Sequence, residues 1–205
     1  MKNICVYASA SDNVDKKYFE VAEKLGILLA REGYNLVFGG GTVGLMGACA
    51  RGFHKENKKV ISVIPEFLKL PGVYYEESDE CYVTESMRKR KRIMEDLSEG
   101  FVVLPGGFGT YEELMEIVTL KQLGRHNKPI AVVNSLGFYN KLKEIFHNLV
   151  EEKFTQEKYL ELFYFADNEK KAVEYVVNYQ AKEIEPKWGK AKGWEEEKLK
   201  VQMKS

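Results

Sequence analysis

Short apolar runs and amphipathic stretches alternate along this chain of 205 residues. The apolar runs predict strands at Ile4–Tyr7, Leu36–Phe38, Val60–Ile64, Cys81–Val83, Phe101–Leu104 and Ile130–Val133. The amphipathic stretches predict helices at Tyr18–Arg31, Gly44–Lys55, Glu85–Leu97, Thr110–Leu123 and Phe138–Lys153. Because the strands are continuously apolar and alternate with helices of about ten to fifteen residues, they indicate parallel βαβ units with helices on both faces of a sheet.

The fold class that follows is α/β, with a Rossmann-like, doubly wound parallel sheet in a single domain over residues 1–182. Residues 66–79 are expected to form a loop. Residues 183–205 are charged and irregular, and we interpret them as a tail without chemistry. In such folds ligands bind beyond the carboxyl ends of the strands. The corresponding segments follow Tyr7, Phe38, Val83 and Leu104.

The balance of charge narrows the classes of function. Thirty-one Lys and Arg residues oppose thirty-one Asp and Glu residues, whereas general nucleic-acid binders carry a basic excess. No apolar run reaches the length of about 18 residues needed to cross a bilayer, and no secretory signal precedes the first strand. Three scattered cysteines are too few for a disulfide scaffold or a zinc site. We therefore expect a cytoplasmic protein that binds neither nucleic acid nor membrane.

A glycine-rich loop, Gly39–Gly47, follows the second predicted strand and opens a helix. Glycines let the backbone approach a ligand closely, and the free N–H groups of a helix start favour an anion. Residues 39–44 also match G-x-G-x-x-G, with Glu66 at a spacing that suits a ribose contact. Two alternatives stay open. One is a dinucleotide site, although that fingerprint normally follows the first strand, and the other is a tight turn that binds nothing.

A second glycine-rich segment, Pro105–Thr110, follows a buried strand and opens another helix. No Gly-Lys-Ser/Thr follows it, so it is not a Walker A loop. We expect a phosphate to rest on Gly106, Gly107, Gly109 and Thr110. Gly40 and Gly41 of the first loop would approach the sugar-phosphate. Two such loops at one edge of a sheet suit a compact phosphate-bearing ligand.

An arginine interrupts an apolar stripe on the helix predicted over 85–97. A basic run usually forms a solvated face, but helical spacing aligns Arg90 with Met87, Ile93, Met94 and Leu97. A buried guanidinium is unfavourable unless an anion pairs with it. We therefore single out Arg90 as functional. The basic residues expected to remain in water are Arg88, Lys89 and Arg92.

Glu113 is the natural partner for Arg90. It shares a helical face with Ile117, whereas Glu112 points away. Two interpretations stay open. Glu113 could complete a capping box in which Thr110 is the N-cap, or it could be a carboxylate beside the second glycine loop, within reach of Arg90, that takes part in chemistry.

Taken together, these motifs resemble the LOG family, the cytokinin riboside 5′-monophosphate phosphoribohydrolases that are often labelled lysine decarboxylases. Pro105–Glu113 matches the family's P-G-G-x-G-T-x-x-E motif, and Arg90-Lys91 matches its Arg-Lys pair 15 positions before that proline. The Gly-Gly-Gly-x-x-Gly-Leu-Met-Gly loop supports both. The resemblance runs from about residue 3 to about residue 178.

The resemblance implies a Rossmann-like homodimer, without a metal or redox cofactor, that releases N6-modified adenine and ribose 5-phosphate. It implies catalytic roles for Arg90 and Glu113, and substrate contacts from Met87, Lys91 and both glycine loops. Ser9 and Ser11 are further candidates for substrate binding. The chain has Ala-Ser-Ala-Ser there, where the family often has Cys-Gly-Ser-Ser, so the preferred base stays open between N6-modified and plain adenine.

The hypothesis for function is therefore hydrolysis of the N-glycosidic bond of a nucleoside 5′-monophosphate. Glu113 would stabilise the oxocarbenium-like sugar and orient or deprotonate the attacking water. Arg90 would hold Glu113 ionised or grip the ligand. No second carboxyl group that could protonate the leaving base stands out. The alternatives are a non-catalytic nucleotide or cofactor carrier and, less in keeping with the motifs, an NAD(P)-dependent oxidoreductase.

Overall fold

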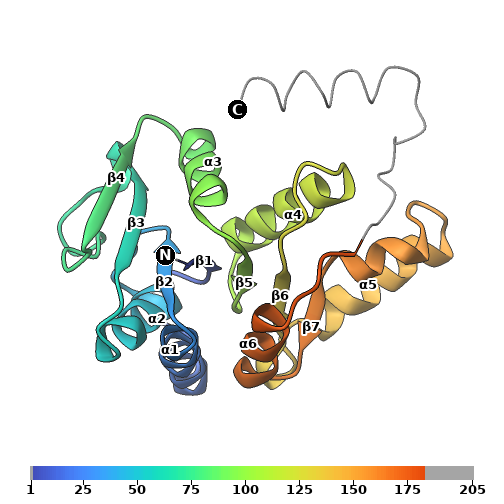
Figure 1. The fold of residues 1–205 in the computed structure, drawn as a ribbon, viewed down its shortest axis with the longest axis horizontal. Coiled ribbons are helices and arrows are strands. Elements are labelled where there is room, and N and C mark those ends of the chain that lie inside the picture. The colour runs from blue at the N-terminus through green and yellow to red at the C-terminus, as the bar shows by residue number, and fades with distance from the viewer. Residues whose placement is uncertain (1, 183–205) are drawn as a thin grey trace.

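A seven-stranded parallel sheet runs through the protein in the order β4-β3-β2-β1-β5-β6-β7 (Figure 1). The computed structural model describes residues 2–182, and the segment expected to be a tail, 183–205, lies outside the described residues. The strands are β1 Lys2–Tyr7, β2 Tyr34–Phe38, β3 Val60–Pro65, β4 Glu80–Thr84, β5 Phe101–Val103, β6 Ile130–Val133 and β7 Tyr164–Ala166. The predicted Rossmann-like α/β class is confirmed.

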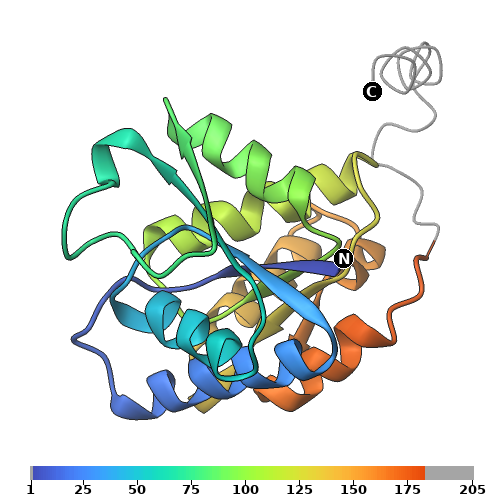
Figure 2. The ribbon, with the colours of Figure 1, turned by 60° about the vertical axis from the view of Figure 1, so that its left-hand side comes forward.

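Helices cover both faces of the sheet (Figure 2). The α-helices of the described chain are α1 Lys16–Arg31, α2 Gly44–Lys55, α3 Met87–Leu97, α4 Phe108–Gln122, α5 Asn140–Glu151 and α6 Glu169–Val177. On one face α1, α2 and α6 form a core with side chains such as Leu25 and Val173. On the other face α3, α4 and α5 form a second core with side chains such as Met94 and Ile117. Burial on both faces explains why the central strands are continuously apolar.

Several predicted elements begin or end elsewhere, for local reasons. Helix α3 starts at Met87 because Ser86 is its N-cap, with the hydroxyl accepting a hydrogen bond from the Lys89 amide at 3.3 Å. Helix α5 starts at Asn140, after a short 3₁₀ turn (η2, Ser135–Gly137) in which Leu136 has a φ of 53°. The sequence pattern does not predict β7, α6 or the 3₁₀ segment η3 (Glu157–Leu162), since a strand of three residues is too short to stand out.

The strand order reverses at β1, which lies between β2 and β5. The segments after β1 and β5 leave the sheet side by side, and the Ser9 amide donates a hydrogen bond to the Pro105 carbonyl at 3.2 Å. Such a switch point opens a crevice at the carboxyl ends of the strands. The fold therefore brings the segment after β1 and both glycine loops to one edge of the sheet.

Close packing of α1 against α2 fixes the helix that follows the first glycine loop. A Cβ on Gly26 would lie 2.3 Å from the Cys49 carbonyl oxygen, and one on Gly52 would lie 2.3 Å from the Glu23 carbonyl oxygen. Glycine at both positions therefore lets the two helix backbones touch. No helix among residues 2–182 has the length and apolar character required to span a membrane.

Candidate active site

A cavity of about 370 Å³ lies at the switch point, within the size range of small-ligand pockets. Its walls come from four strand ends, from α2, α3 and α4, and from the segment between β3 and β4. The lining residues are Ala8, Ser9, Ala10, Gly39, Gly41, Val43, Met46, Ile64, Leu68, Val73, Arg90, Gly107, Gly109, Thr110 and Glu113. Both expected catalytic residues thus face the same cavity as parts of both glycine loops.

Arg90 is buried, with 7% of its surface exposed. Its Nε donates to the Val63 carbonyl at 3.1 Å, and its Nη1 donates to Glu113 Oε1 at 3.2 Å. The burial expected from the apolar stripe, and the pairing with Glu113, are both confirmed. Because the backbone carbonyl holds one edge of the guanidinium and the carboxylate holds another, Arg90 has a defined orientation in the cavity wall.

The other basic residues of α3 do not line the cavity. Arg88, Lys89 and Arg92 are exposed, as expected. Lys91 instead bridges α3 to α4 through ion pairs with Glu112 and, at 2.7 Å, with Glu116. The two carboxylates raise the pKa of the Lys91 amine against the effect of partial burial. The structure therefore does not bring Lys91 to the cavity wall, and Met87 lies near Arg90 at the protein surface.

Glu113 is the sixth residue of α4, because the helix begins at Phe108 with Gly107 as its N-cap. The capping-box interpretation is wrong, because it requires Thr110 at the N-cap, and Thr110 is instead the third residue of the helix. Only 7% of Glu113 is exposed. Burial raises its pKa from 4.5 to about 7, although the Arg90 charge acts in the opposite direction. The cavity therefore contains a carboxyl group that titrates near neutral pH.

The start of α2 is not free to bind an anion, contrary to what the glycine pattern suggests. The Asp12 carboxylate accepts a hydrogen bond from the Gly44 amide at 2.7 Å. The Ser9 carbonyl accepts two more, from the amides of Leu45 and Met46. These groups satisfy the N–H groups that a phosphate would otherwise need. The first glycine loop thus shapes the cavity wall with its backbone but does not offer this helix start to a ligand.

The start of α4 is different. Among residues 2–182, no acceptor bonds the amides of Phe108, Gly109 or Thr110. Gly109 and Thr110 line the cavity, and the dipole of α4 adds a partial positive charge at this end of the helix. Gly106 is required here for space, because a Cβ would lie 2.1 Å from the Thr110 hydroxyl oxygen. The second loop therefore has the geometry of an anion site.

Asp12 gives a prediction about stability. Replacing Asp12 by Ala removes the acceptor from the first amide of α2 and is expected to lower the free energy of unfolding by about 1 kcal/mol. Asp12→Asn keeps an acceptor oxygen and should lose less. Urea denaturation of the three proteins measures the difference. Equal stability of the Ala variant and the wild type would mean that the carboxylate does not cap α2.

Ser9 and Ser11 lie near the cavity in different ways. Ser9 lines it, and also lines a second, apolar cavity of about 270 Å³ between the β1 segment and the second glycine loop. Ser11 and Gly106 line only the second cavity. Gly40 does not line the first cavity, but its carbonyl accepts the Tyr75 amide at 2.8 Å.

The segment between β3 and β4, residues 66–79, supplies an apolar wall that the sequence does not assign. Leu68 and Val73 line the cavity. The Val73 carbonyl also accepts a hydrogen bond from the Thr42 amide at 2.9 Å, so the segment is tied to the first glycine loop. The apolar character of residues 67–75 was the available signal, but only the folded chain shows which of them turn inward.

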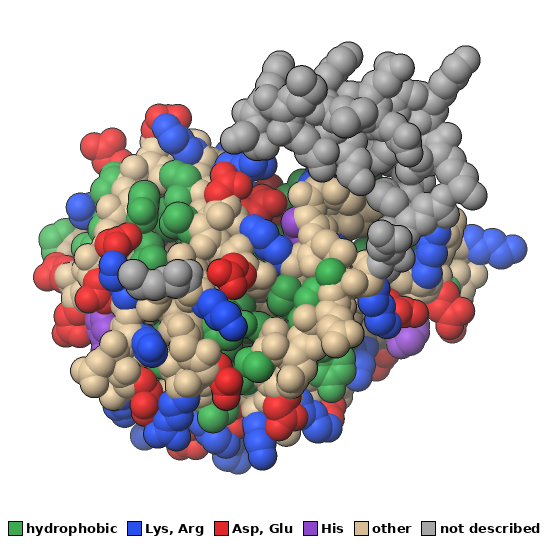
Figure 3. All heavy atoms as spheres, viewed as in Figure 1, with side chains coloured by type: hydrophobic (Ala, Val, Ile, Leu, Met, Phe, Trp, Pro, Cys, Tyr) green, Lys and Arg blue, Asp and Glu red, His purple; other side chains and the backbone are tan. Residues whose placement is uncertain are grey.

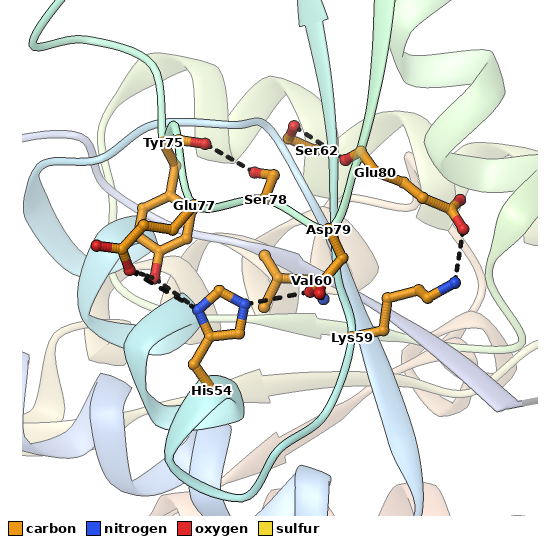
Figure 4. A network of polar contacts seen from close by, with 9 residues as sticks. All are labelled: His54, Lys59, Val60, Ser62, Tyr75, Glu77, Ser78, Asp79 and Glu80. Carbon is orange, nitrogen blue, oxygen red and sulfur yellow. Dashed lines mark hydrogen bonds and ion pairs between the residues drawn. The ribbon is translucent and has the colours of Figure 1, made fainter.

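A polar network holds this wall against the end of α2 (Figure 4). His54 forms hydrogen bonds with the Tyr75 hydroxyl at 3.0 Å and with the Asp79 carboxylate at 3.2 Å. Asp79 also accepts the Val60 amide at 2.8 Å. The helix that follows the first glycine loop therefore also anchors the β3–β4 segment.

The remaining alternatives find less support in the geometry. Glu66, the residue proposed for a ribose contact in a dinucleotide site, is exposed and does not line the cavity. Within residues 2–182 there is no cluster of three or more His, Cys, Asp or Glu side chains suited to a metal ion. The charged side chains that line the cavity are Arg90 and Glu113, and they lie beside the open start of α4.

Comparison with known proteins agrees with these motifs. A family model described as "Possible lysine decarboxylase" matches residues 46–176. The cytokinin riboside 5′-monophosphate phosphoribohydrolase LOG7 of Arabidopsis thaliana is 36% identical over 179 residues, which are 87% of this chain and 82% of LOG7. A second cytokinin riboside 5′-monophosphate phosphoribohydrolase of Arabidopsis thaliana, LOG1, is 34% identical over 198 residues, which are 97% of this chain and 92% of LOG1.

Solved structures share the fold at lower identity. The molybdenum cofactor carrier protein of Chlamydomonas reinhardtii is 22% identical, with a TM-score of 0.66 over 85% of this chain and 95% of the carrier. The molybdenum cofactor binding protein of Rippkaea orientalis is also 22% identical, with a TM-score of 0.67 over 86% of this chain and 96% of that protein. At this identity the likeness extends to the fold alone.

Proposed function

This chain belongs to the LOG family of phosphoribohydrolases, and we propose that it hydrolyses the N-glycosidic bond of a nucleoside 5′-monophosphate. The products are the free base and ribose 5-phosphate. The proposed substrates are N6-modified adenosine monophosphates, such as a cytokinin riboside 5′-monophosphate, with plain AMP as the alternative. The single observation that carries the proposal is the buried Arg90–Glu113 pair, at 3.2 Å, in the cavity beside the open start of α4.

The geometry suggests how the ligand lies. A 5′-phosphate on the amides of Phe108, Gly109 and Thr110 would neutralise the positive end of α4. Glu113 follows one turn further along the same helix, so the ribose would reach it from the phosphate. The base would then lie toward the apolar part of the cavity wall, which includes Ile64, Leu68 and Val73.

In the proposed reaction, the bond between ribose C1′ and the base nitrogen breaks, and its electron pair leaves with the base. Positive charge develops on the sugar, and ionised Glu113 stabilises it. The oxygen of a water molecule bonds to C1′, and Glu113 accepts one proton from that water. The departing base takes one proton from solvent, and Glu113 afterwards returns its proton to solvent, so that the overall reaction consumes one water. Arg90 favours the ionised form of Glu113 and holds the carboxylate in place.

Base release from a panel of nucleotides tests this function. Incubation with AMP and isopentenyl-AMP, followed by chromatography, should yield the free base and ribose 5-phosphate. A carrier would bind the nucleotides and release no base. An oxidoreductase would instead show a spectral or affinity response to NAD(P). Absence of base release across the panel would contradict the proposal.

We further propose that the protein is a cytoplasmic homodimer. Exposed apolar side chains gather on β4 and the adjoining β3–β4 segment, at the left of Figure 3. They include Phe67, Leu70, Tyr82 and Val83. Exposed apolar side chains on an edge strand are typical of a protein interface. Sedimentation of the purified protein at the mass of a monomer would contradict the dimer.

A further inference from the structure

Gly39, the residue directly after β2, lies against the Arg90 guanidinium. A Cβ at this position would be 1.9 Å from Nη2 and 3.0 Å from Cζ of Arg90. Real carbon atoms do not approach so closely, so any side chain at position 39 must displace the guanidinium. Gly39 does not have a positive φ, so its backbone conformation does not require glycine. Glycine is needed at position 39 because a side chain there would occupy the space of the Arg90 guanidinium.

Gly39 is one of three groups that surround the Arg90 guanidinium. The Val63 carbonyl on β3 accepts from Nε at 3.1 Å, and Glu113 on α4 accepts from Nη1 at 3.2 Å. The third group is the bare Cα at the end of β2, against which Nη2 packs. A planar guanidinium that is restrained in three directions has one orientation, and that orientation directs Nη1 at the carboxylate.

The other glycines of this loop meet different neighbours. A Cβ on Gly47 would lie 1.8 Å from the Thr42 carbonyl oxygen, which belongs to the loop itself. Gly40 and Gly44 have positive φ values of 77° and 65°, which favour glycine for conformational reasons. A Cβ on Gly41 would lie 2.5 Å from the Met46 side chain, the methyl group of an apolar residue. Among these glycines, Gly39 is the one whose missing side chain leaves room for the charged group of the proposed site.

We propose that Gly39 is a positioning residue, whose lack of a side chain sets Arg90 against Glu113. The catalytic consequence rests on the proposed phosphoribohydrolase function. The steric coupling between positions 39 and 90 stands on the geometry alone, so the two can fail separately.

Gly39→Ala is expected to fold, because the obstacle is the far end of a flexible side chain and not the backbone. Arg90 would turn away from Glu113. We expect kcat for base release to fall by about 10- to 100-fold, since a misplaced catalytic group loses much of its effect. KM should change less than about threefold, because the amides at the start of α4, where the phosphate is proposed to bind, are not in contact with position 39. A group that acts mainly in the transition state affects kcat more than it affects KM. A merely structural defect would not produce this split.

A double-mutant cycle tests the coupling. Wild type, Gly39→Ala, Arg90→Ala and the double variant are compared for kcat and for urea denaturation. In the Arg90→Ala background the obstacle is gone, so Gly39→Ala should cause no further loss in kcat and little change in the denaturation midpoint. If Gly39→Ala alone fails to fold, the double variant should fold again.

Three results would overturn the proposal. They are an unchanged kcat in Gly39→Ala, losses from the two substitutions that multiply as independent effects, and a double variant that fails to fold when Arg90→Ala folds. If the wild-type protein releases no base, the proposed function fails instead. The denaturation cycle then still decides whether Gly39 and Arg90 are sterically coupled.

Discussion

Glu113→Gln is expected to lower kcat for base release by about 10³-fold while nucleotide binding survives. Gln keeps the shape of the side chain and an oxygen that can accept from Arg90, so the cavity should remain intact. It cannot carry negative charge, and so it can neither stabilise the sugar cation nor accept a proton from water. Single-turnover base release, together with equilibrium binding of the nucleotide, separates the two effects.

Glu112→Gln is the matched control for this substitution. Glu112 precedes Glu113 on α4, but it is exposed and pairs with Lys91 outside the cavity. Its change should leave kcat within a few-fold of the wild type. Near-normal turnover in Glu113→Gln would remove Glu113 from the mechanism, whatever the control shows.

The pH dependence of the wild type provides a second readout of Glu113. Burial raises its pKa to about 7. The titratable groups that act on it electrostatically are Arg90 and Lys91 from α3, Glu112 from its own helix, and Tyr7 and Cys5 from β1. Because the ionised form is the active one, kcat/KM should rise with pH through about 7. This acid limb should be absent from the residual activity of Glu113→Gln. A flat wild-type profile between about pH 5.5 and pH 8.5 would contradict this assignment.

Arg90→Ala is expected to reduce turnover by about 10²-fold or more and to destabilise the protein. The folded-state pKa of Glu113 lies above its ordinary value of 4.5, so the folded protein binds the additional proton. The stability from that proton is present at low pH and is lost as pH rises through about 7. Without Arg90 the pKa rises further, and above neutral pH an unpaired carboxylate is left buried. The loss in unfolding free energy should therefore grow with pH, toward about 3 kcal/mol.

Urea denaturation at about pH 5.5 and about pH 8.5 measures this growth. Arg88→Ala is the control, because Arg88 lies on the same helix and is exposed. It should alter stability by less than about 0.5 kcal/mol at either pH. An Arg90→Ala variant that is equally destabilised at both pH values would show that Glu113 does not depend on Arg90 for its charge.

Local pattern was sufficient to identify most of the fold and the central pair of the site. The apolar runs around Val6, Val37 and Val102 correspond to buried strands, since continuous burial on two faces leaves an unbroken apolar signal. The position of Arg90 on an apolar stripe indicated a buried charge, because helical spacing decides which residues share a face. Short elements such as β7 left no comparable signal.

The sequence pattern located helix boundaries less accurately, and the observed start of α4 changed the interpretation of Glu113. The pattern Thr-x-x-Glu is compatible with a capping box at Thr110, but α4 begins at Phe108 and places Glu113 well inside the helix. The residue at which α4 begins depends on where β5 ends and on the direction in which the chain leaves the sheet. Both depend on the position of β5 in the folded sheet. A local motif therefore could not choose between a cap and a site.

By itself, then, the sequence determined the class of fold, the two glycine loops and the burial of Arg90, because each depends on periodicity or on spacing along the chain. It indicated Glu113 as a partner for Arg90, but only the structure shows that the two side chains pair. Only the tertiary structure decided that Asp12 occupies the start of α2, that Lys91 leaves the cavity and that Gly39 makes room for Arg90. These contacts join residues from different elements. Their geometry follows from how the helices and strands pack, which no spacing along one chain segment encodes.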